Sequence, residues 1–117
     1  YRVIPGISSV QQLAAAHRIV LNGIGEPLLI TTGRRLARAV ESGAENIVVM
    51  LDGDLACRAL TGNWDIYWGA YLGGPDETLV AGRLTDVIDE ITSTRAALKQ
   101  NKGWIMDTYL LRRTHPA

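Results

Sequence analysis

Three short turns of the sequence place glycine at the end of a predicted strand, where a ligand can approach the main chain. The first is Pro5-Gly6-Ile7-Ser8-Ser9, at a strand-to-helix junction. The second, Met50-Leu51-Asp52-Gly53, ends the most apolar run of the chain, and the third is Leu72-Gly73-Gly74-Pro75-Asp76-Glu77. Ligands of α/β sheets bind at strand ends. Two strand ends that offer free amides and carbonyls can hold a flat, polar ligand such as an adenosine.

Other apparent motifs fail on their spacing. Gly23-Ile24-Gly25 lacks the third glycine of a dinucleotide-binding loop and does not open a helix after a strand. Asp52-Gly53-Asp54 begins like a calcium loop but lacks its later ligands. His17 and His115 are far apart, with no second histidine or cysteine at ligand spacing, so no metal is expected. Cys57 is expected to be an inert core residue.

Alternating strands and helices must position these turns. Strands are predicted at residues 1–4, 28–31, 46–51, 64–70, 77–82 and 104–111, with Gly103 starting the last one. Helices are predicted from Ser8 and Ser9, over 34–40, over 55–60, and over a long segment that Thr85 caps. The two strands around Pro75 follow each other too closely for a crossover helix. The sequence therefore predicts an α/β fold, with a mixed sheet of about five to six strands flanked by helices.

Composition excludes several classes of protein. The 117 residues are enough for one domain, and 47% hydrophobic with 21% charged residues is a globular profile. Lys and Arg together number 12, as do Asp and Glu, so the basic excess of a nucleic-acid-binding domain is missing. No apolar run reaches the roughly 20 residues of a membrane span. A single cysteine forms no internal disulfide and fits a reducing compartment, the cytoplasm.

The same turns carry a resemblance to a known family, the tetrapyrrole (corrin and porphyrin) methyltransferases that use S-adenosylmethionine. Val3-Ile4-Pro5-Gly6-Ile7-Ser8-Ser9 is similar to the stretch that links the two domains of these enzymes. Asn46 to Gly53 is similar to their apolar strand, with Leu51 at its usual Met position and Asp52 at its usual Gly position. Gly74-Pro75-Asp76-Glu77, followed by Gly82-Arg83-Leu84, is similar to their later turn, strand and helix start.

The resemblance implies a place for this chain in a larger architecture. Enzymes of the family have two α/β domains, and the cofactor is folded into the cleft between them. Residues 1–117 resemble the C-terminal, cofactor-binding domain, which contacts S-adenosylmethionine through its main chain. By position, those contacts carry over to Leu51 with its neighbour Asp52, and to Leu72 with Gly73. The Gly-rich loop and Gly-Asp-Pro motif of the N-terminal domain do not occur in this sequence, and the chain begins on an apolar strand without Met, so we expect a piece of a longer protein.

The resemblance also implies a reaction and a substrate. Ile30 to Arg35 and Gly103 to Arg113 resemble a member of the family that acts in aerobic cobalamin synthesis. It methylates a ring carbon of precorrin-5 and releases an acetyl group as acetate, giving precorrin-6A. Arg34 and Arg35 are then candidates for binding the many carboxylates of a tetrapyrrole, since guanidinium forks suit carboxylates. Their alternative role is a solvated helix start. No catalytic base can be named, and the family implies a homodimer.

Three other functions stay open at this stage. The chain can belong to another corrin-ring methyltransferase of the same family. It can be a non-catalytic ligand-binding or dimerisation domain, which suits a complete protein of this length. It can also be half of a nucleotide-binding enzyme unrelated to corrins. A Gly-rich strand-loop-helix upstream of this chain would favour the methyltransferase.

Overall fold

Five strands form a single mixed sheet in the computed structural model, which describes residues 13–18, 28–50, 52–53, 55–72 and 74–114. The strands and helices of these residues follow in the chain order β1 (Leu29–Thr32), η1 (Gly33–Arg35), α2 (Leu36–Glu41), β2 (Asn46–Met50), η2 (Ala56–Ala59), β3 (Trp64–Ala70), β4 (Thr78–Arg83), α3 (Leu84–Lys102) and β5 (Asp107–Arg113). Residues 13–17 are also helical. The predicted strand at residues 1–4 and the helix start at Ser8 and Ser9 lie outside the described residues.

The sheet has the strand order β1-β2-β5-β3-β4. β1 runs parallel to β2, with Leu29 opposite Ile47, while β5 runs antiparallel to both β2 and β3. β3 and β4 are also antiparallel, as their short connection requires. The prediction of an α/β fold with a mixed sheet is therefore confirmed.

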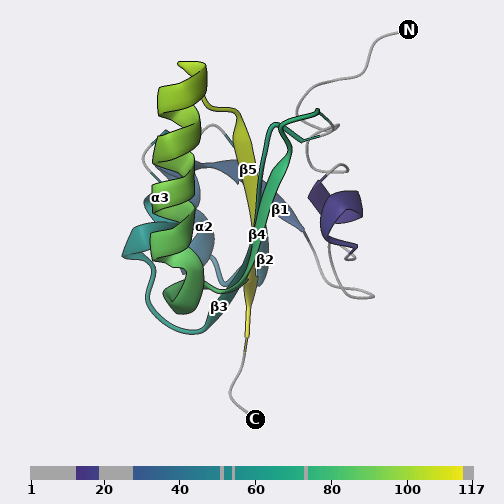
Figure 1. The fold of residues 1–117 in the computed structure, drawn as a ribbon. Coiled ribbons are helices and arrows are strands. Elements are labelled where there is room, and N and C mark those ends of the chain that lie inside the picture. The colour runs from purple at the N-terminus through teal and green to yellow at the C-terminus, as the bar shows by residue number, and fades with distance from the viewer. Residues whose placement is uncertain (1–12, 19–27, 51, 54, 73, 115–117) are drawn as a thin grey trace, which may run out of the picture.

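Helices cover both faces of the sheet (Figure 1). α2 and α3 lie on one face, and the helical residues 13–17 lie on the other. Because side chains alternate along a strand, neighbouring residues of β2 serve different cores. Ile47 and Val49 join the larger core beneath α2 and α3, while Val48 packs with Leu13 and Leu110 on the opposite face. The uninterrupted apolar run of β2 is thus explained by burial on both faces.

Five local details of the sequence prediction are wrong. Thr85 does not cap α3: the helix begins at Leu84, after Arg83 in extended conformation. Gly103 does not start a strand but ends α3 with φ +78, a conformation that favours glycine. The last strand consequently begins at Asp107 rather than Trp104. The helices predicted over 34–40 and 55–60 are shorter, because a 3-10 turn precedes α2 and η2 is itself a 3-10 turn.

α3 is long but polar. Of its 19 residues, Leu84 and Ile91 are buried, and acidic and basic side chains occupy much of the remaining surface. No helix within the described residues is long and apolar enough to cross a membrane.

The topology brings several segments to one edge of the sheet. β1 and β2 run parallel and end there at Thr32 and Met50. The end of β3 at Ala70 lies opposite both the start of β4 at Thr78 and the start of β5 at Asp107. The segments that follow β1, β2 and β3 therefore share this edge, which is where two of the three glycine turns were expected to act.

Candidate functional site

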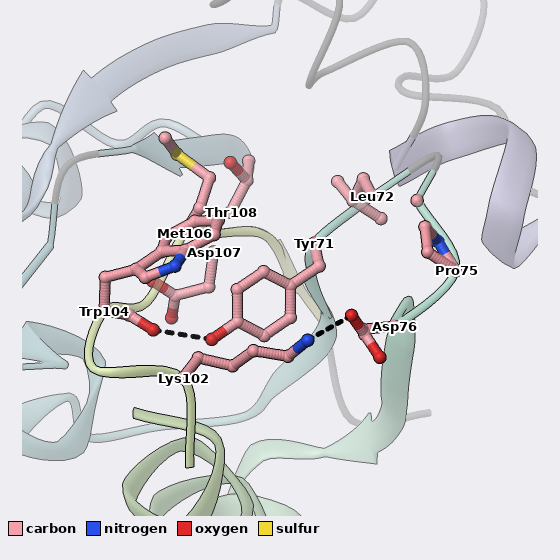
Figure 2. A pocket seen from close by; sticks show the side chains of 10 residues that line it. Tyr71, Leu72, Pro75, Asp76, Lys102, Trp104, Met106, Asp107 and Thr108 are labelled. Carbon is pink, nitrogen blue, oxygen red and sulfur yellow. Dashed lines mark hydrogen bonds and ion pairs between the residues drawn. The ribbon is translucent and has the colours of Figure 1, made fainter. Parts of the chain in front are cut away.

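A pocket of about 350 Å³ opens at the end of β3 (Figure 2). Its walls come from the segment after β3, from the end of α3, and from the connection between α3 and β5. The residues that line it are Tyr71, Leu72, Gly74, Pro75, Asp76, Lys102, Trp104, Met106, Asp107 and Thr108. This size and mixture of apolar surface with a few polar groups is typical of a small-molecule site.

Tyr71 forms the centre of the pocket wall. Its φ is +52, an uncommon conformation for a residue with a side chain, and its N–H donates to the Met106 carbonyl at 2.9 Å. Its hydroxyl donates to the Trp104 carbonyl at 2.6 Å, and the two rings meet edge to face at 4.9 Å. Backbone strain of this kind persists where the surroundings fix it, and it clusters at ligand sites. Tyr71 is therefore held rigidly against the segment before β5.

Trp104 and Met106 expose apolar surface at the pocket. They are 53% and 56% accessible, although neighbouring Tyr71 is buried. Large apolar side chains that are exposed next to each other are typical of a surface that binds a ligand or another protein domain. The sequence prediction missed this pair because it placed both residues inside a strand. The signal was the C-terminal glycine of α3, since a helix that ends at Gly103 leaves Trp104 in a connection.

Charged side chains lie at the rim of the pocket. Lys102 forms an ion pair with Asp76 across the opening, and its amino group lies 6.0 Å from the centre of the Tyr71 ring. Both members of the pair are well exposed, so the pair contributes little to stability. Figure 2 shows this ion pair beside the Tyr71 ring, among the residues that line the pocket.

The end of β2 is tightly built into the protein. Asp52 is 7% accessible, and its carboxylate accepts hydrogen bonds from the Tyr109 hydroxyl and from the Ala56 N–H, the latter at 2.7 Å. Gly33 packs against this side chain so closely that a Cβ there would lie 2.3 Å from the Asp52 carboxylate oxygen. The Asp52 side chain thus ties the ends of β1 and β2 to β5 and to η2.

Two buried side chains with weakly acidic protons, Cys57 and Tyr109, lie next to Asp52. Burial raises the pKa of the Cys57 thiol to about 11, with a smaller upward contribution from the Asp52 charge. Burial also raises the pKa of the Tyr109 hydroxyl, and its contacts with Cys57 and Asp52 act in the same direction. Both groups are therefore protonated at neutral pH. The expected place of Cys57 in the core is confirmed, and a protonated, buried thiol is a poor nucleophile.

Comparison with known proteins places the chain in a family. Residues 1–88 match the sequence model of the Tetrapyrrole (Corrin/Porphyrin) Methylases. The chain belongs to this family. It is 52% identical over 114 residues to a "Precorrin-6A synthase [deacetylating]" from Sinorhizobium sp. It is also similar to the crystal structure of a cobalamin synthesis related protein, CobF, from Corynebacterium diphtheriae, with 40% identity and a TM-score of 0.87.

The chain spans less than half of these relatives. The alignment covers 97% of this chain but 44% of the Sinorhizobium protein, and the structural match covers 92% of this chain but 45% of CobF. The family membership that the sequence resemblance predicted is confirmed, and so is the predicted fold class. The C-terminal position of the domain stays a prediction.

The structure describes two of the four predicted cofactor residues of this methylase chain, Leu72 and Asp52. Leu72 lines the pocket, while Leu51 and Gly73 lie outside the described residues. Asp52 lines an adjoining groove of about 250 Å³, which shares Met106 and Asp107 with the pocket. The roles of these four residues in cofactor binding stay predictions.

Arg34 and Arg35 are exposed on η1, directly after β1. They lie on the same edge of the sheet as the pocket, because β1 and β2 end together, but they do not line it. Their role as substrate ligands also stays a prediction. Within the described residues, no group of His, Cys, Asp and Glu side chains is arranged to hold a metal ion.

Arg95 is the residue that sequence reasoning missed most clearly. It projects from α3 to Asp107 and to the main chain after β2, so it links the pocket wall to the adjoining groove. Its partners are 12, 42 and 43 residues away in the chain. No local pattern in the sequence predicts contacts over such separations.

Proposed function

We propose that this chain is part of an S-adenosylmethionine-dependent C-methyltransferase that acts on a corrin precursor in cobalamin biosynthesis. The reaction would be the methylation and deacetylation of precorrin-5 to precorrin-6A. The observation that carries the proposal is the 52% identity over 114 residues to a precorrin-6A synthase of the deacetylating type. Membership of the tetrapyrrole methylases and the likeness to CobF support it.

Features of the pocket at the end of β3 support the binding of an adenosyl group there. Its volume of about 350 Å³ suits a nucleoside, and the exposed Trp104 ring beside the fixed Tyr71 ring offers an apolar wall for a base. Leu72 supplies a further apolar contact at the same wall. When bound, S-adenosylmethionine would supply an activated methyl group on its sulfonium. We further propose that Leu51, Asp52, Leu72 and Gly73 contact this cofactor through their main chain.

The chain's own contribution to the reaction would be positioning. The nucleophilic carbon of the macrocycle and the methyl group need to be aligned at near-attack distance, which can lower a barrier by ~7–11 kcal/mol. The rigid strand ends suit this task, because Tyr71 and Asp52 are each held by several contacts. Arg34 and Arg35 would bind substrate carboxylates from the end of β1. Their exposure leaves the guanidinium groups accessible to such a ligand.

The proposal extends to the whole protein. Residues 1–117 would form the C-terminal domain, with the cofactor enclosed between it and an N-terminal domain, in a cytoplasmic homodimer. The exposed apolar surface of Trp104 and Met106 is the kind of surface that a ligand and a second domain would cover.

The decisive experiment follows two products at once. Protein carrying this chain would be incubated with precorrin-5 and S-adenosylmethionine labelled in its methyl group. We expect label in the macrocycle and acetate in equal amounts. Methylation without acetate would favour another corrin-ring methyltransferase of the family. Ligand binding with no transfer of label would favour the non-catalytic binding domain.

A binding comparison tests the two-domain arrangement. Calorimetric titration with S-adenosylmethionine would be performed on residues 1–117 and on a protein in which a complete relative's N-terminal region precedes them. We expect weak or undetectable binding in the first case, because part of the cofactor surface would be missing, and clear binding in the second. Equally tight binding by residues 1–117 would contradict a site enclosed by two domains.

A further inference from the structure

Arg95 connects α3 to two other segments, the main chain after β2 and the start of β5. Its Nε donates to Asp107 at 3.0 Å, and its two terminal nitrogens donate to the carbonyl oxygens of Gly53 at 3.2 Å and Asp52 at 3.1 Å. Its side chain is 12% accessible and that of Asp107 is 6% accessible. A guanidinium held by three partners at once has little freedom to move.

The two carbonyls lie beyond the last paired residue of β2. The ladder between β2 and β5 ends with Met50 opposite Thr108, so the sheet itself does not fix the main chain of Asp52 and Gly53. The Asp52 carboxylate is already held by the Tyr109 hydroxyl and by the Ala56 N–H. Arg95 adds the contacts that hold the main-chain carbonyls of Asp52 and Gly53.

Asp107 connects Arg95 to the pocket wall. The carboxylate oxygen that accepts the Arg95 bond also accepts the Trp68 indole N–H at 2.8 Å, which fixes it against β3. Asp107 lines both the pocket and the adjoining groove. One guanidinium thus sets the position of the segment after β2 relative to the pocket wall at the start of β5.

We propose that Arg95 is a positioning residue for the cofactor: it fixes the main chain after β2 in the orientation that S-adenosylmethionine requires. The proposal rests on the proposed function, because it assumes that this main chain faces the cofactor. Arg95 itself would not touch the reacting atoms. Its two carbonyl contacts would make the cofactor site rigid before binding, so less ordering would accompany binding.

The test compares three variants in protein that binds the cofactor, using calorimetric titration with S-adenosylmethionine and thermal unfolding. Arg95→Lys keeps a cation beside Asp107, but a single ammonium cannot reproduce the planar fork that reaches both carbonyls. Arg95→Met removes the cation as well. Arg38→Met is the control, because Arg38 is an exposed cation of α2 that lines neither the pocket nor the adjoining groove.

The expected pattern separates positioning from folding. In Arg95→Lys, Kd and KM for the cofactor should rise at least about tenfold, the loss typical of a charged hydrogen bond. The Tm should stay close to that of the wild type, and KM for the tetrapyrrole should change little. Arg95→Met should lose at least as much affinity, with a lower Tm. Arg38→Met should bind the cofactor like the wild type, because removing a cation from the exposed surface leaves the contacts after β2 intact.

Three outcomes would overturn the proposal. Normal cofactor affinity in Arg95→Lys would show that the carbonyl contacts do not position the site. An Arg95→Lys protein that is unfolded at the assay temperature would assign Arg95 to the fold alone. A wild-type protein that does not bind S-adenosylmethionine would overturn the proposed function together with this one. The first two outcomes leave wild-type binding intact, so they are distinguishable from the third.

Discussion

Cys57 and Tyr109 place a pH limit on the stability of the fold. The folded protein keeps the Cys57 proton because its pKa is raised to about 11, whereas the unfolded chain releases that proton near pH 9.0. Between these values the unfolded state binds fewer protons, so the free energy of unfolding falls as pH rises. The contribution is complete below about pH 9, and two pKa units correspond to a loss of roughly 3 kcal/mol by about pH 11. The raised pKa of Tyr109 acts in the same direction at still higher pH.

We therefore predict that the free energy of unfolding changes little between neutral pH and about pH 9 and declines above it. Urea unfolding across this range would measure the effect. Cys57→Ala should be less stable at neutral pH, because a buried side chain is lost, yet its decline above about pH 9 should be shallower. The same slope in both proteins would contradict the assignment of this proton to Cys57.

Gly33 provides a second prediction at this scale. A Cβ at this position would lie 2.3 Å from the carboxylate oxygen and 2.4 Å from the carboxyl carbon of Asp52. Asp52 is buried and its carboxylate accepts two hydrogen bonds, so moving this side chain away costs free energy. Gly33→Ala should lower the free energy of unfolding by roughly 1–3 kcal/mol. Gly53→Ala is the matched control, because a Cβ there meets nothing within 4 Å. Equal stability of the two variants would contradict the close packing of Gly33 on Asp52.

Among the elements, α3 depends on few side chains for its attachment to the sheet. Leu84 and Ile91 are its buried residues, and Val87, Ile88 and Leu98 pack partly against the core. Ile91 is fully buried near the middle of the helix. Ile91→Ala should therefore lower the free energy of unfolding by roughly 2–5 kcal/mol, measured by urea unfolding. Glu90→Ala, at the exposed neighbouring position, should leave it nearly unchanged. A small effect of Ile91→Ala would show that α3 is held mainly by its polar contacts.

Sequence analysis correctly predicted the elements whose position depends on a short run of neighbouring residues. β2 was evident from the apolar run of Ile47 to Met50, and the short β3–β4 connection from Gly74 and Pro75. The start of α3 was misplaced because Arg83, which has no capping side-chain bond, precedes it. The roles of Asp52 and Arg95 depend on partners up to 57 residues away. Such contacts arise from the topology of the sheet, which no local period specifies.

For the molecule as a whole, the arginines after β1 test the proposed substrate. In protein that carries out the methyl transfer, Arg34→Glu combined with Arg35→Glu would place two negative charges where substrate carboxylates are expected to lie. Like-charge placement is costly, so KM for the tetrapyrrole should rise at least roughly tenfold, while cofactor affinity stays nearly constant. Arg38→Glu, on the exposed surface of α2, should change neither constant. Unchanged kinetics in the double variant would assign Arg34 and Arg35 to the solvated surface.

The position of β5 in the sheet has a consequence for biosynthesis. A ribosome produces β1, β2, β3 and β4 before β5, yet β5 is the strand that joins the two pairs, β1 with β2 and β3 with β4. Until residues 107–113 leave the exit tunnel, one edge of β2 and one edge of β3 have no partner and are open to pairing with other chains. Of the described strands, the last one synthesised thus completes the sheet and also delivers Asp107 to Arg95 and Tyr109 to Asp52. Unpaired strand edges favour aggregation, so the nascent chain is most exposed to wrong strand pairing before β5 takes its place in the sheet.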